Sequence, residues 1–203
     1  MNNFFEILRG GINTTFQDLG RDNLYHVGLP FSGAIDKRNF LIANSLITNR
    51  EDDAVLEFAY QGPLLEFSGS QTSIVITGNV NFKIIKKDTS EIKGECYRTY
   101  NLNNKDCLDI ISTEKSVYGY LSVKGGFQLN KFCNSYSTTV RAEVGPNDGK
   151  KIEIGQTIIL NTIESTIKKS LEYSNSKIEF IRVIKGTNFD YFSEESVKDF
   201  TSK

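Results

Sequence analysis

The sequence predicts a mainly β protein, a barrel or a sandwich, with one short internal helix and a second helix near the C-terminal end. Most segments alternate apolar with polar residues at period two and are rich in Ile, Val, Phe, Tyr and Thr, which is typical of strands packed on one face. Turns that contain Gly or Asn separate these segments. Two stretches instead space their apolar residues as a helix does.

The alternation also indicates where the strands lie. Two short strands, Phe5–Ile7 and Thr14–Phe16, flank a turn at Gly10-Gly11. Gly78-Asn79 is a two-residue turn signal, so we expect a β-hairpin between the strands on either side of it. The further strands are expected, in chain order, at Ala54–Tyr60, Pro63–Phe67, Ser73–Thr77, Asn81–Lys87, Cys107–Ser112, Val117–Val123, Thr138–Ala142, Lys151–Ile154, Thr157–Leu160 and Lys177–Ile184.

The internal helix is expected from Asp36 to Ile47, where the apolar residues at helical spacing are Phe40, Ala43 and Ile47. Asp36 can cap the free N–H groups of the first turn, and Asn49 can close the far end. Asn44 shares the apolar face, and a buried amide without partners would cost about 1–3 kcal/mol. We therefore expect Asn44 to bond either neighbouring backbone or a ligand.

The C-terminal helix is expected to begin after Ser193 and to run to about Phe200. Ser193 can cap it, and Phe192 and Val197 occupy the positions of a hydrophobic staple. The two residues that follow Ser193 are acidic, which suits the positive end of the helix dipole. The sequence identifies no partner for the apolar side of this helix, so we expect it to open a further unit.

Composition argues against several classes of function. The 203 residues carry a formal net charge of -1, so no basic field would attract nucleic acid or an anionic membrane surface. No stretch approaches the ~18 apolar residues of a membrane span and no signal-peptide pattern opens the chain, so we expect a soluble cytoplasmic protein. Cys96, Cys107, Cys133 and the single histidine, His26, lack the spacing of a disulfide framework or a zinc site. We expect reduced thiols and no metal.

Special polar residues are concentrated between Gly11 and Phe67, at a density that core packing does not require. Among them Gln17, Asp18 and Arg21 closely follow a predicted strand. In one interpretation Arg21 binds a carboxylate or phosphate and Asp18 holds the guanidinium in place. In the other, Asp18 turns the chain and pairs with Arg21 internally.

Ser32 lies in a Gly/Pro loop that leads into the internal helix, so backbone N–H groups near Gly33 could hold an anion, although a plain capped helix is the commoner explanation. A Ser32 nucleophile is disfavoured because G-x-S-x-G is absent and His26, interpreted as a loop histidine, is the one available histidine base. Glu57, within its strand, is either a solvated carboxylate or a general base. To the hydroxyl-rich loop Asn134–Thr138 we assign no catalytic role.

Four stretches resemble, in order and spacing, the opening of the biotin-dependent carboxyltransferase family: G-I-N-T-T-F-Q-D-L-G-R, G-L-P-F-S-G-A-I-D, A-N-S-L-I-T-N and L-E-F-A-Y-Q-G-P-L-L-E-F. A later block, G-Y-L-S-V-K-G-G-F followed by S-Y-S-T-T and G-K-K-I-E-I-G-Q, resembles the next motifs of that family. Together the matches span about Gly10 to Gly155. The family includes the C subunit of 5-oxoprolinase, the KipA-type antagonist of a sensor-kinase inhibitor, and the matching part of urea carboxylase.

The resemblance implies a cyclophilin-like β-barrel over residues 1–190 and, over residues 191–203, the start of a second subdomain that this sequence lacks. It implies a C-subunit-like component of ATP-dependent 5-oxoprolinase, which opens 5-oxoproline to glutamate together with a related B subunit (KipI-like) and an A subunit. ATP would be used by the complex, with no ATP site assigned to this chain. Two alternatives stay open: a KipA-like regulatory protein that binds a kinase inhibitor, and a carboxyltransferase subunit of the urea-carboxylase type, which alone would require a biotin carrier.

The resemblance also implies site residues, although it identifies no catalytic residue. The substrate-binding candidates are Arg21, Ser32, Glu57 and Gln17, and the residues expected to support the site are Asp18, Asp36 and Asn44. Where the family usually has Gly-Ser-Arg-Ser-Thr, this chain has Asn134–Thr138, so Tyr136 replaces a frequent arginine. Family members continue past the final helix, so we expect either a fragment or a shortened protein whose active site is incomplete.

Overall fold

The computed structural model of the chain describes residues 2–161, 166–173 and 180–202. The chain divides into two compact units, Met1–Glu172 and Tyr173–Lys203. Every strand assigned within the described residues belongs to the first unit. The candidate site residues also lie there, so the first unit is the one that positions the site.

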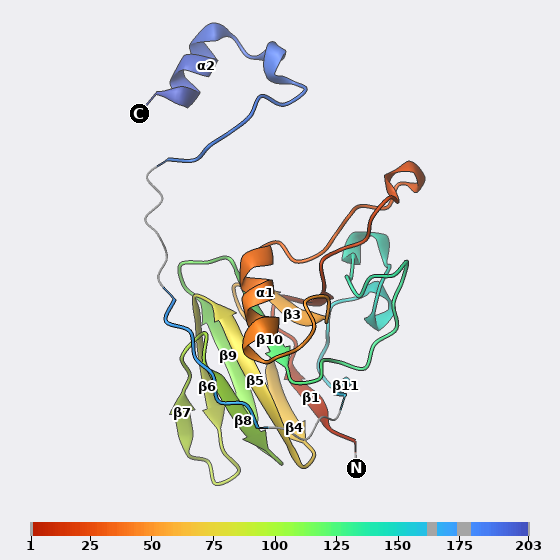
Figure 1. Cartoon of the computed structure of the whole chain (residues 1–203), viewed down its shortest axis with the longest axis vertical. Helices are drawn as coiled ribbons and strands as arrows, with labels where there is room; N and C mark the ends of the chain where they lie inside the picture. Colours follow the sequence, from red (N-terminus) through yellow and green to blue (C-terminus); the bar gives the residue numbers. More distant parts are fainter. Residues whose placement is uncertain (1, 162–165, 174–179, 203) are drawn as a thin grey trace. The chain divides into compact units, whose positions relative to one another are not determined.

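Two antiparallel sheets make up the first unit (Figure 1). The six-stranded sheet has the strand order β11-β1-β4-β9-β6-β7, and the five-stranded sheet has the order β2-β3-β10-β5-β8. The strands of the first sheet are β1 (Phe4–Arg9), β4 (Leu64–Ser68), β6 (Val80–Ile85), β7 (Glu91–Lys93), β9 (Cys107–Thr113) and β11 (Thr157–Ile159). Those of the second are β2 (Asn13–Gln17), β3 (Val55–Ala59), β5 (Gln71–Gly78), β8 (Thr99–Asn103) and β10 (Tyr118–Val123).

The core lies between the two sheets, because inward-facing residues of both contribute to one buried apolar cluster. Phe5 and Phe67 of the first sheet meet edge to face with ring centroids 5.7 Å apart, and Phe16 of the second sheet meets Phe127 at 5.3 Å. Burial of one such side chain contributes about 1.5–3 kcal/mol to folding. The mainly β class is confirmed. No closed barrel is found among the described strands, so the cyclophilin-like barrel is not confirmed.

Helix α1 (Lys37–Leu46) lies across β5 and β10, on the outer face of the five-stranded sheet (Figure 1). Asp36 caps it as predicted, because its Oδ1 accepts the N–H of Asn39 at 3.0 Å. Phe40 and Ala43 are fully buried, which confirms the apolar face read from the sequence. The helix therefore covers a sheet face that would otherwise be exposed, and it brings its own N-terminal loop over β3 and β10.

The hairpin predicted at Gly78-Asn79 is wrong. Strand β5 pairs with β8 and β10 in one sheet, whereas β6 pairs with β7 and β9 in the other. Gly78 has a φ of 106°, and Asn79 alone separates the two strands, so the chain bends here from one sheet into the other. The turn residues do mark a sharp bend. The pairing partner of each strand is decided instead by the apolar face that it buries.

Two other predicted strands are irregular in the structure. Thr138–Ala142 ends in a 3-10 turn, and Lys151–Ile154 contains no strand. Both segments instead cover the outer edge of β2, since Thr138 N–H donates to the carbonyl of Phe16 and Ile152 N–H to that of Thr14, each at 2.9 Å. The 3-10 turns of the described chain are η1 (Tyr25–Val27), η2 (Val140–Ala142), η3 (Asn147–Gly149) and η4 (Phe189–Tyr191).

Strands β7 and β8 were missed by the sequence prediction. All three residues of β7 are exposed, and β8 carries Asn101 and Asn103, so neither strand shows a clear alternation. The prediction at Lys177–Ile184 is wrong in its described part, because residues 180–184 have no strand assignment. Its residues 177–179 lie outside the described residues.

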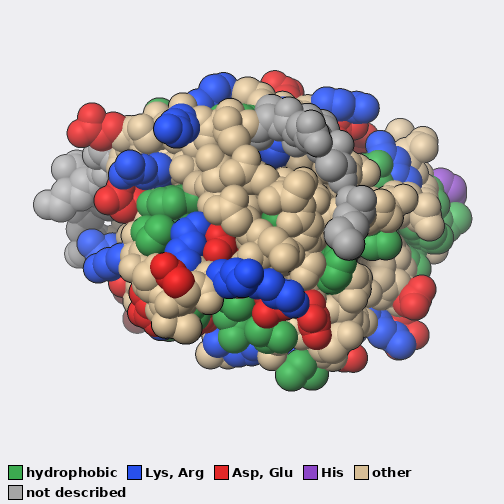
Figure 2. All heavy atoms as spheres, turned by 90° about the horizontal axis from the view of Figure 1, so that it is seen from below, with side chains coloured by type: hydrophobic (Ala, Val, Ile, Leu, Met, Phe, Trp, Pro, Cys, Tyr) green, Lys and Arg blue, Asp and Glu red, His purple; other side chains and the backbone are tan. Residues whose placement is uncertain are grey.

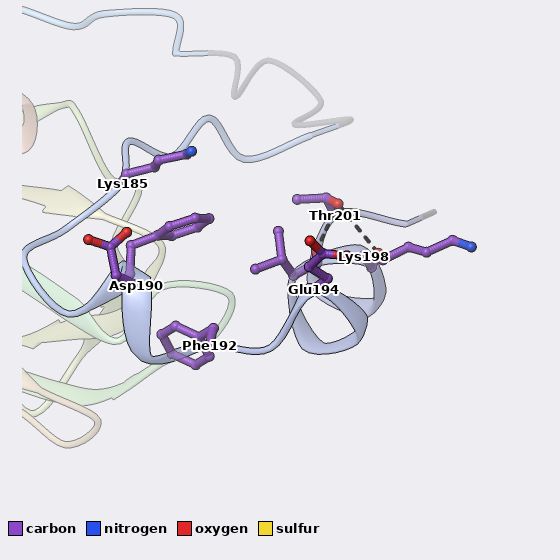
Figure 3. A pocket seen from close by; sticks show the side chains of 8 residues that line it. Lys185, Asp190, Phe192, Glu194, Lys198 and Thr201 are labelled. Atoms are coloured by element: carbon purple, nitrogen blue, oxygen red, sulfur yellow. Dashed lines mark hydrogen bonds between the residues drawn. The ribbon is translucent and has the colours of Figure 1, made fainter.

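The second unit carries helix α2 (Glu194–Thr201). Ser193 caps it as predicted, because its Oγ accepts the N–H of Ser196 at 3.2 Å. A hollow of about 580 Å³ lies between η4 and α2, and Figure 3 shows the side chains around it. Its lining is Lys185, Phe189, Asp190, Phe192, Glu194, Val197, Lys198 and Thr201. None of the candidate site residues is part of this lining.

The surface carries charges of both signs. On the face drawn in Figure 2, the side chains of Lys and Arg are interspersed with those of Asp and Glu rather than gathered into a patch of one sign. This distribution agrees with the net charge of -1. Among the described residues, no helix has both the length and the apolar character needed to cross a bilayer.

Candidate functional site

The carboxylate of Asp18, which directly follows β2, binds the hydroxyl-rich loop Asn134–Thr138. Its Oδ1 accepts hydrogen bonds from Gly20 N–H at 2.8 Å, Ser135 Oγ at 2.7 Å and Ser137 Oγ at 2.5 Å. Its Oδ2 accepts the N–H of Tyr136 at 2.6 Å. A carboxylate that is 4% exposed is thus satisfied entirely by neutral donors. Asp18 thus fixes a loop that lies more than a hundred residues further along the chain.

That loop begins with a tight two-residue turn. Phe132 and Ser135 exchange backbone hydrogen bonds of 2.9 and 3.1 Å. Between them, Cys133 and Asn134 have φ values of 49° and 60°, the combination that a type I′ turn requires. The asparagine of N-S-Y-S-T is therefore a turn residue, and the three residues that follow Ser135 continue past Asp18 to Thr138.

Arg21 is held by the same loop rather than by Asp18. Its Nη1 donates to Thr139 Oγ1 at 2.8 Å, and its Nη2 donates to the carbonyl of Ser137. The guanidinium carbon lies 5.7 Å from the centroid of the Phe132 ring, within the range of a cation–π contact. The predicted internal pair of Asp18 with Arg21 is not among the ion pairs of the residues that the structure describes.

Arg21 is consequently a buried cation. The residue is 2% exposed, and its Nε–H has no hydrogen-bond partner among the described residues. Burial lowers the pKa of the guanidinium, and the nearby negative charge of Asp18 partly opposes this shift. A guanidinium without a carboxylate in contact retains a positive potential that an anionic ligand could use.

Ser32 meets Arg21 at a shared partner. Its Oγ lies 2.5 Å from Thr139 Oγ1, the same oxygen that accepts from Arg21. Ser32 and Gly33 both have left-handed backbones, with φ of 56° and 88°. A Cβ on Gly33 would lie 2.8 Å from the backbone nitrogen of Gly20, so this position requires glycine.

Glu57 is placed beneath the loop that leads into α1. It lies opposite Tyr120 in the pairing of β3 with β10, and it is 6% exposed, so it is not a solvated strand carboxylate. Its Oε2 accepts the N–H of Ile35 and the hydroxyl of Tyr120, each at 2.8 Å, and the Tyr120 oxygen accepts the N–H of Asp36 at 2.7 Å. The backbone N–H groups of Ile35 and Asp36 that could have held an external anion thus donate to side chains of the protein itself. Burial raises the pKa of Glu57, against the opposing effect of these hydrogen bonds.

The remaining candidates bind the protein backbone. Gln17 Nε2 donates to Thr15 Oγ1 and to the carbonyl of Thr138, both at 2.9 Å, while its buried Oε1 has no partner in the part of the chain that the structure describes. Asn44 Nδ2 donates to the carbonyl of Asp53 at 2.8 Å, and its Oδ1 accepts from Ser122 Oγ at 2.7 Å. Asn44 therefore bonds neighbouring backbone, which is the first of the two alternatives expected from the sequence.

The structure therefore brings four of the predicted residues, Gln17, Asp18, Arg21 and Ser32, to one segment, residues 135–139. Arg21 and Ser32 share Thr139, and Gln17 binds the adjacent Thr138. Glu57 reaches this group only through the Ser32–Asp36 loop. The residues missed by the sequence are Tyr120, Ser135, Ser137 and Thr139. The one available signal was the density of hydroxyl groups in S-Y-S-T-T, which gave no indication of their partners.

Two further features of the surroundings are a hollow beside Phe132 and the position of the single histidine. A hollow of about 370 Å³, lined by residues 128–132 and 145–148, adjoins the site through Phe132. His26 lies in η1, whose residues are exposed, and η1 projects away from the sheets in Figure 1. The arrangement of a buried cation beside two hydroxyl groups can bind and orient a carboxylate or an amide oxygen. It offers no histidine as a base.

Known proteins are similar to this chain in sequence and in fold. The family described as carboxyltransferase domain, subdomain A and B, matches residues 27–203. The urea amidolyase of Saccharomyces cerevisiae is 28% identical over 98% of this chain and 11% of its own length. The 5-oxoprolinase C subunit of Haemophilus influenzae is 29% identical over 94% of this chain and 60% of its own length. The chain thus spans less than two thirds of either relative.

Solved structures are similar over most of the chain. The crystal structure of the K. lactis urea amidolyase superposes with a TM-score of 0.72 and 27% identity, over 83% of this chain and 10% of that one. A crystal structure of TTHA0988 superposes with a TM-score of 0.80 over 97% of this chain and 38% of that one. At 23% identity, the second comparison shows a common fold alone.

Proposed function

The chain belongs to the family of the carboxyltransferase domain, subdomains A and B, and we propose that within this family it serves as a C-subunit-like component of an ATP-dependent 5-oxoprolinase. The observation that carries the proposal is the 29% identity to a 5-oxoprolinase C subunit over 94% of this chain. The chain corresponds to 60% of that protein and to 11% of the urea amidolyase.

The proposed substrate is 5-oxoproline, a cyclic amide that carries a carboxylate. The assembled enzyme adds water across the amide bond, with hydrolysis of ATP, and releases glutamate. In this chain Ser32 is the proposed contact residue, because its hydroxyl is only partly buried and is held by Thr139. Arg21 acts through its charge, since a fixed cation in surroundings of low polarity stabilises a carboxylate or a developing oxyanion.

The other candidate residues hold in place the segments that surround this proposed site. Gln17 holds the backbone of Thr138, and Asp18 fixes the loop from Ser135 to Ser137. Glu57 holds the loop that carries Ser32. The proposed partners are the B and A subunits of the same enzyme, and no ATP site is assigned to this chain.

Reconstitution tests the proposal. The full chain is combined with the partner subunits of 5-oxoprolinase, and ATP-dependent formation of glutamate from 5-oxoproline is measured with and without it. We expect turnover to require this chain, and Ser32→Ala to lower it while Ser70→Ala, at an exposed turn, does not. Equal turnover by the partner subunits alone would contradict the proposal. A tight complex without turnover would instead indicate a regulatory role.

A urea-type carboxyltransferase is the second candidate. It is favoured by the 28% identity to urea amidolyase over 98% of this chain and by the similarity to the K. lactis structure. A biotin carrier would supply the carboxyl group in that role. Consumption of carboxybiotin that depends on both urea and this chain would favour this role over the first.

A further inference from the structure

Two consecutive backbone amides at the entrance of α1 are bound by side chains of the sheet. The N–H of Ile35 donates to Glu57 Oε2 at 2.8 Å, and the N–H of Asp36 donates to the Tyr120 oxygen at 2.7 Å. The Tyr120 hydroxyl in turn donates to Glu57 Oε2 at 2.8 Å. Glu57 is 6% exposed and Tyr120 is fully buried, so water cannot readily replace either acceptor.

The loop just before these amides has little conformational support of its own. Ser32 and Gly33 are successive left-handed residues, a conformation that a serine rarely adopts without external contacts. Two backbone hydrogen bonds flank this pair: Arg21 N–H donates to the carbonyl of Phe31 at 2.8 Å, and Ala34 N–H donates to the carbonyl of Asp18 at 2.9 Å. The amides of Ile35 and Asp36 extend the support on the C-terminal side to the side chains of the sheet.

The anchored loop places Ser32 next to Thr139. Ser32 lies three positions before Ile35, and its Oγ is 2.5 Å from the Thr139 hydroxyl that also accepts from Arg21. A shift of the loop by an ångström would break a hydrogen bond of this length. The position of the Ser32 hydroxyl therefore depends on two side chains that do not touch it.

We propose that Tyr120 and Glu57 are positioning residues that act together on the Ser32–Asp36 loop and so keep the Ser32 hydroxyl against Thr139. Glu57 acts here as a hydrogen-bond acceptor and not as a general base. The role of Tyr120 is the less obvious of the two, because in the sequence it is simply an aromatic residue within a strand. This proposal rests on the proposed function only in the experiment that measures turnover.

Amide hydrogen exchange on the full chain tests the anchor without any substrate. Tyr120→Phe removes the acceptor for Asp36, and Glu57→Leu removes the acceptor for Ile35. In each variant we expect the protection of the amides of residues 34–36 to fall by about tenfold, the equivalent of one lost hydrogen bond. Glu57→Gln keeps an acceptor oxygen in place and should retain the protection. Tyr118→Phe, two residues away on β10, is the matched control and should behave as the wild type.

Two results of the exchange experiment would overturn the proposal. One is unchanged protection of residues 34–36 in both Tyr120→Phe and Glu57→Leu. The other is a loss of protection that spreads equally over β3 and β10, because that pattern would mean a general structural role. Neither result depends on whether the chain belongs to a 5-oxoprolinase.

A double-mutant cycle in the reconstituted enzyme tests the link to Ser32. If Tyr120 acts through Ser32, Tyr120→Phe lowers turnover in the wild-type background and has no further effect in the Ser32→Ala background. Additive losses would contradict that link. If no variant supports turnover in any reconstitution, the proposed function fails, while the exchange result still decides the role of Tyr120.

Discussion

At the scale of single residues, Arg21 is the least ordinary feature of the chain. Most buried guanidinium groups contact a carboxylate, yet Arg21 donates to a carbonyl and a hydroxyl. Asp18 lies nearby but is fully occupied by donors from the same loop. The two side chains thus bind the same peptide segment, and no ion pair between them is found among the described residues.

Replacing Arg21 with methionine separates its charge from its volume. We expect Arg21→Met to lose ligand-dependent activity almost completely, because no cation remains behind Ser32. Folding should lose only about 1–3 kcal/mol, since the buried charge disappears together with its bonds to Ser137 and Thr139. Urea denaturation and turnover measure the two effects. Arg50→Met, at a side chain that is 75% exposed, is the control and should change neither. A variant with normal activity would show that the charge is not used.

Glu57 should give the stability of the chain a recognisable dependence on pH. Burial raises its pKa, so the folded state binds this proton more tightly than the unfolded state does. The contribution of this group is therefore most favourable at low pH and declines as the pH rises from the ordinary glutamate pKa through the raised one. Glu57→Gln cannot titrate, and its unfolding free energy should lack this decline.

The matched control for this experiment is Glu66→Gln. Glu66 is a partly exposed strand glutamate paired with Lys105 at 2.5 Å, and no burial of comparable degree acts on it. This control should keep the decline seen in the wild type when unfolding free energies are measured from acidic to neutral pH. Parallel profiles for the wild type and Glu57→Gln would refute the assignment.

At the scale of elements, the entrance of α1 depends on close backbone contacts. Gly33 has a φ of 88°, and a Cβ there would meet the backbone of Leu19 and Gly20 at 2.8–2.9 Å. Gly28 has a similar φ of 79° but open space around it. Gly28→Ala should therefore cost about 1–2 kcal/mol from the left-handed backbone alone. Gly33→Ala should cost clearly more, and it should also weaken ligand binding. Equal melting temperatures for the two variants would mean that the backbone of Leu19 and Gly20 can move to accommodate the added Cβ.

Elements that carry their own local signal were predictable from the sequence. Asp36 and Ser193 cap the helices as expected, and the alternation around Phe5, Leu56 and Leu121 located three strands correctly. The partners of strands were not predictable, because pairing is a long-range property. Gly78-Asn79 looks like a hairpin turn locally, and only the positions of two separate sheets make it a corner.

At the scale of the whole molecule, the two units should differ in their importance for stability. The buried apolar cluster belongs entirely to the first unit. We expect a chain that ends after Glu172 to unfold cooperatively, with a melting temperature within a few degrees of the full chain. Thermal denaturation followed by circular dichroism measures this. A broad, non-cooperative transition would show that the second unit is needed to complete the core.

A shorter truncation provides the control. Residues 166–171 cover the edge of β8, where Thr99 N–H donates to Lys169 O and Leu171 N–H to Tyr97 O, each at 2.9 Å. A chain that ends after Leu160 loses these bonds and leaves the strand edge open. We expect it to melt at a clearly lower temperature than the chain that ends after Glu172.

The site was predictable only in its first half. Residues 17–36 carry turn glycines, a cap and a guanidinium, which the sequence singles out as unusual. Their partners at Tyr120 and at Ser135 to Thr139 have ordinary local signals for a strand and a loop. Sequence spacing cannot show that these segments meet, because the contacts depend on how the sheets stack.

The separation of Asp18 from its partners has a kinetic consequence. Its hydrogen bonds to Ser135, Tyr136 and Ser137 join residues 117, 118 and 119 positions apart. Closing so long a loop costs entropy that only a nearly complete β architecture can offset. Recovery of ligand binding after dilution from denaturant should therefore coincide with the slowest refolding phase, and a nascent polypeptide still short of Ser135 has no site to protect Arg21 from solvent.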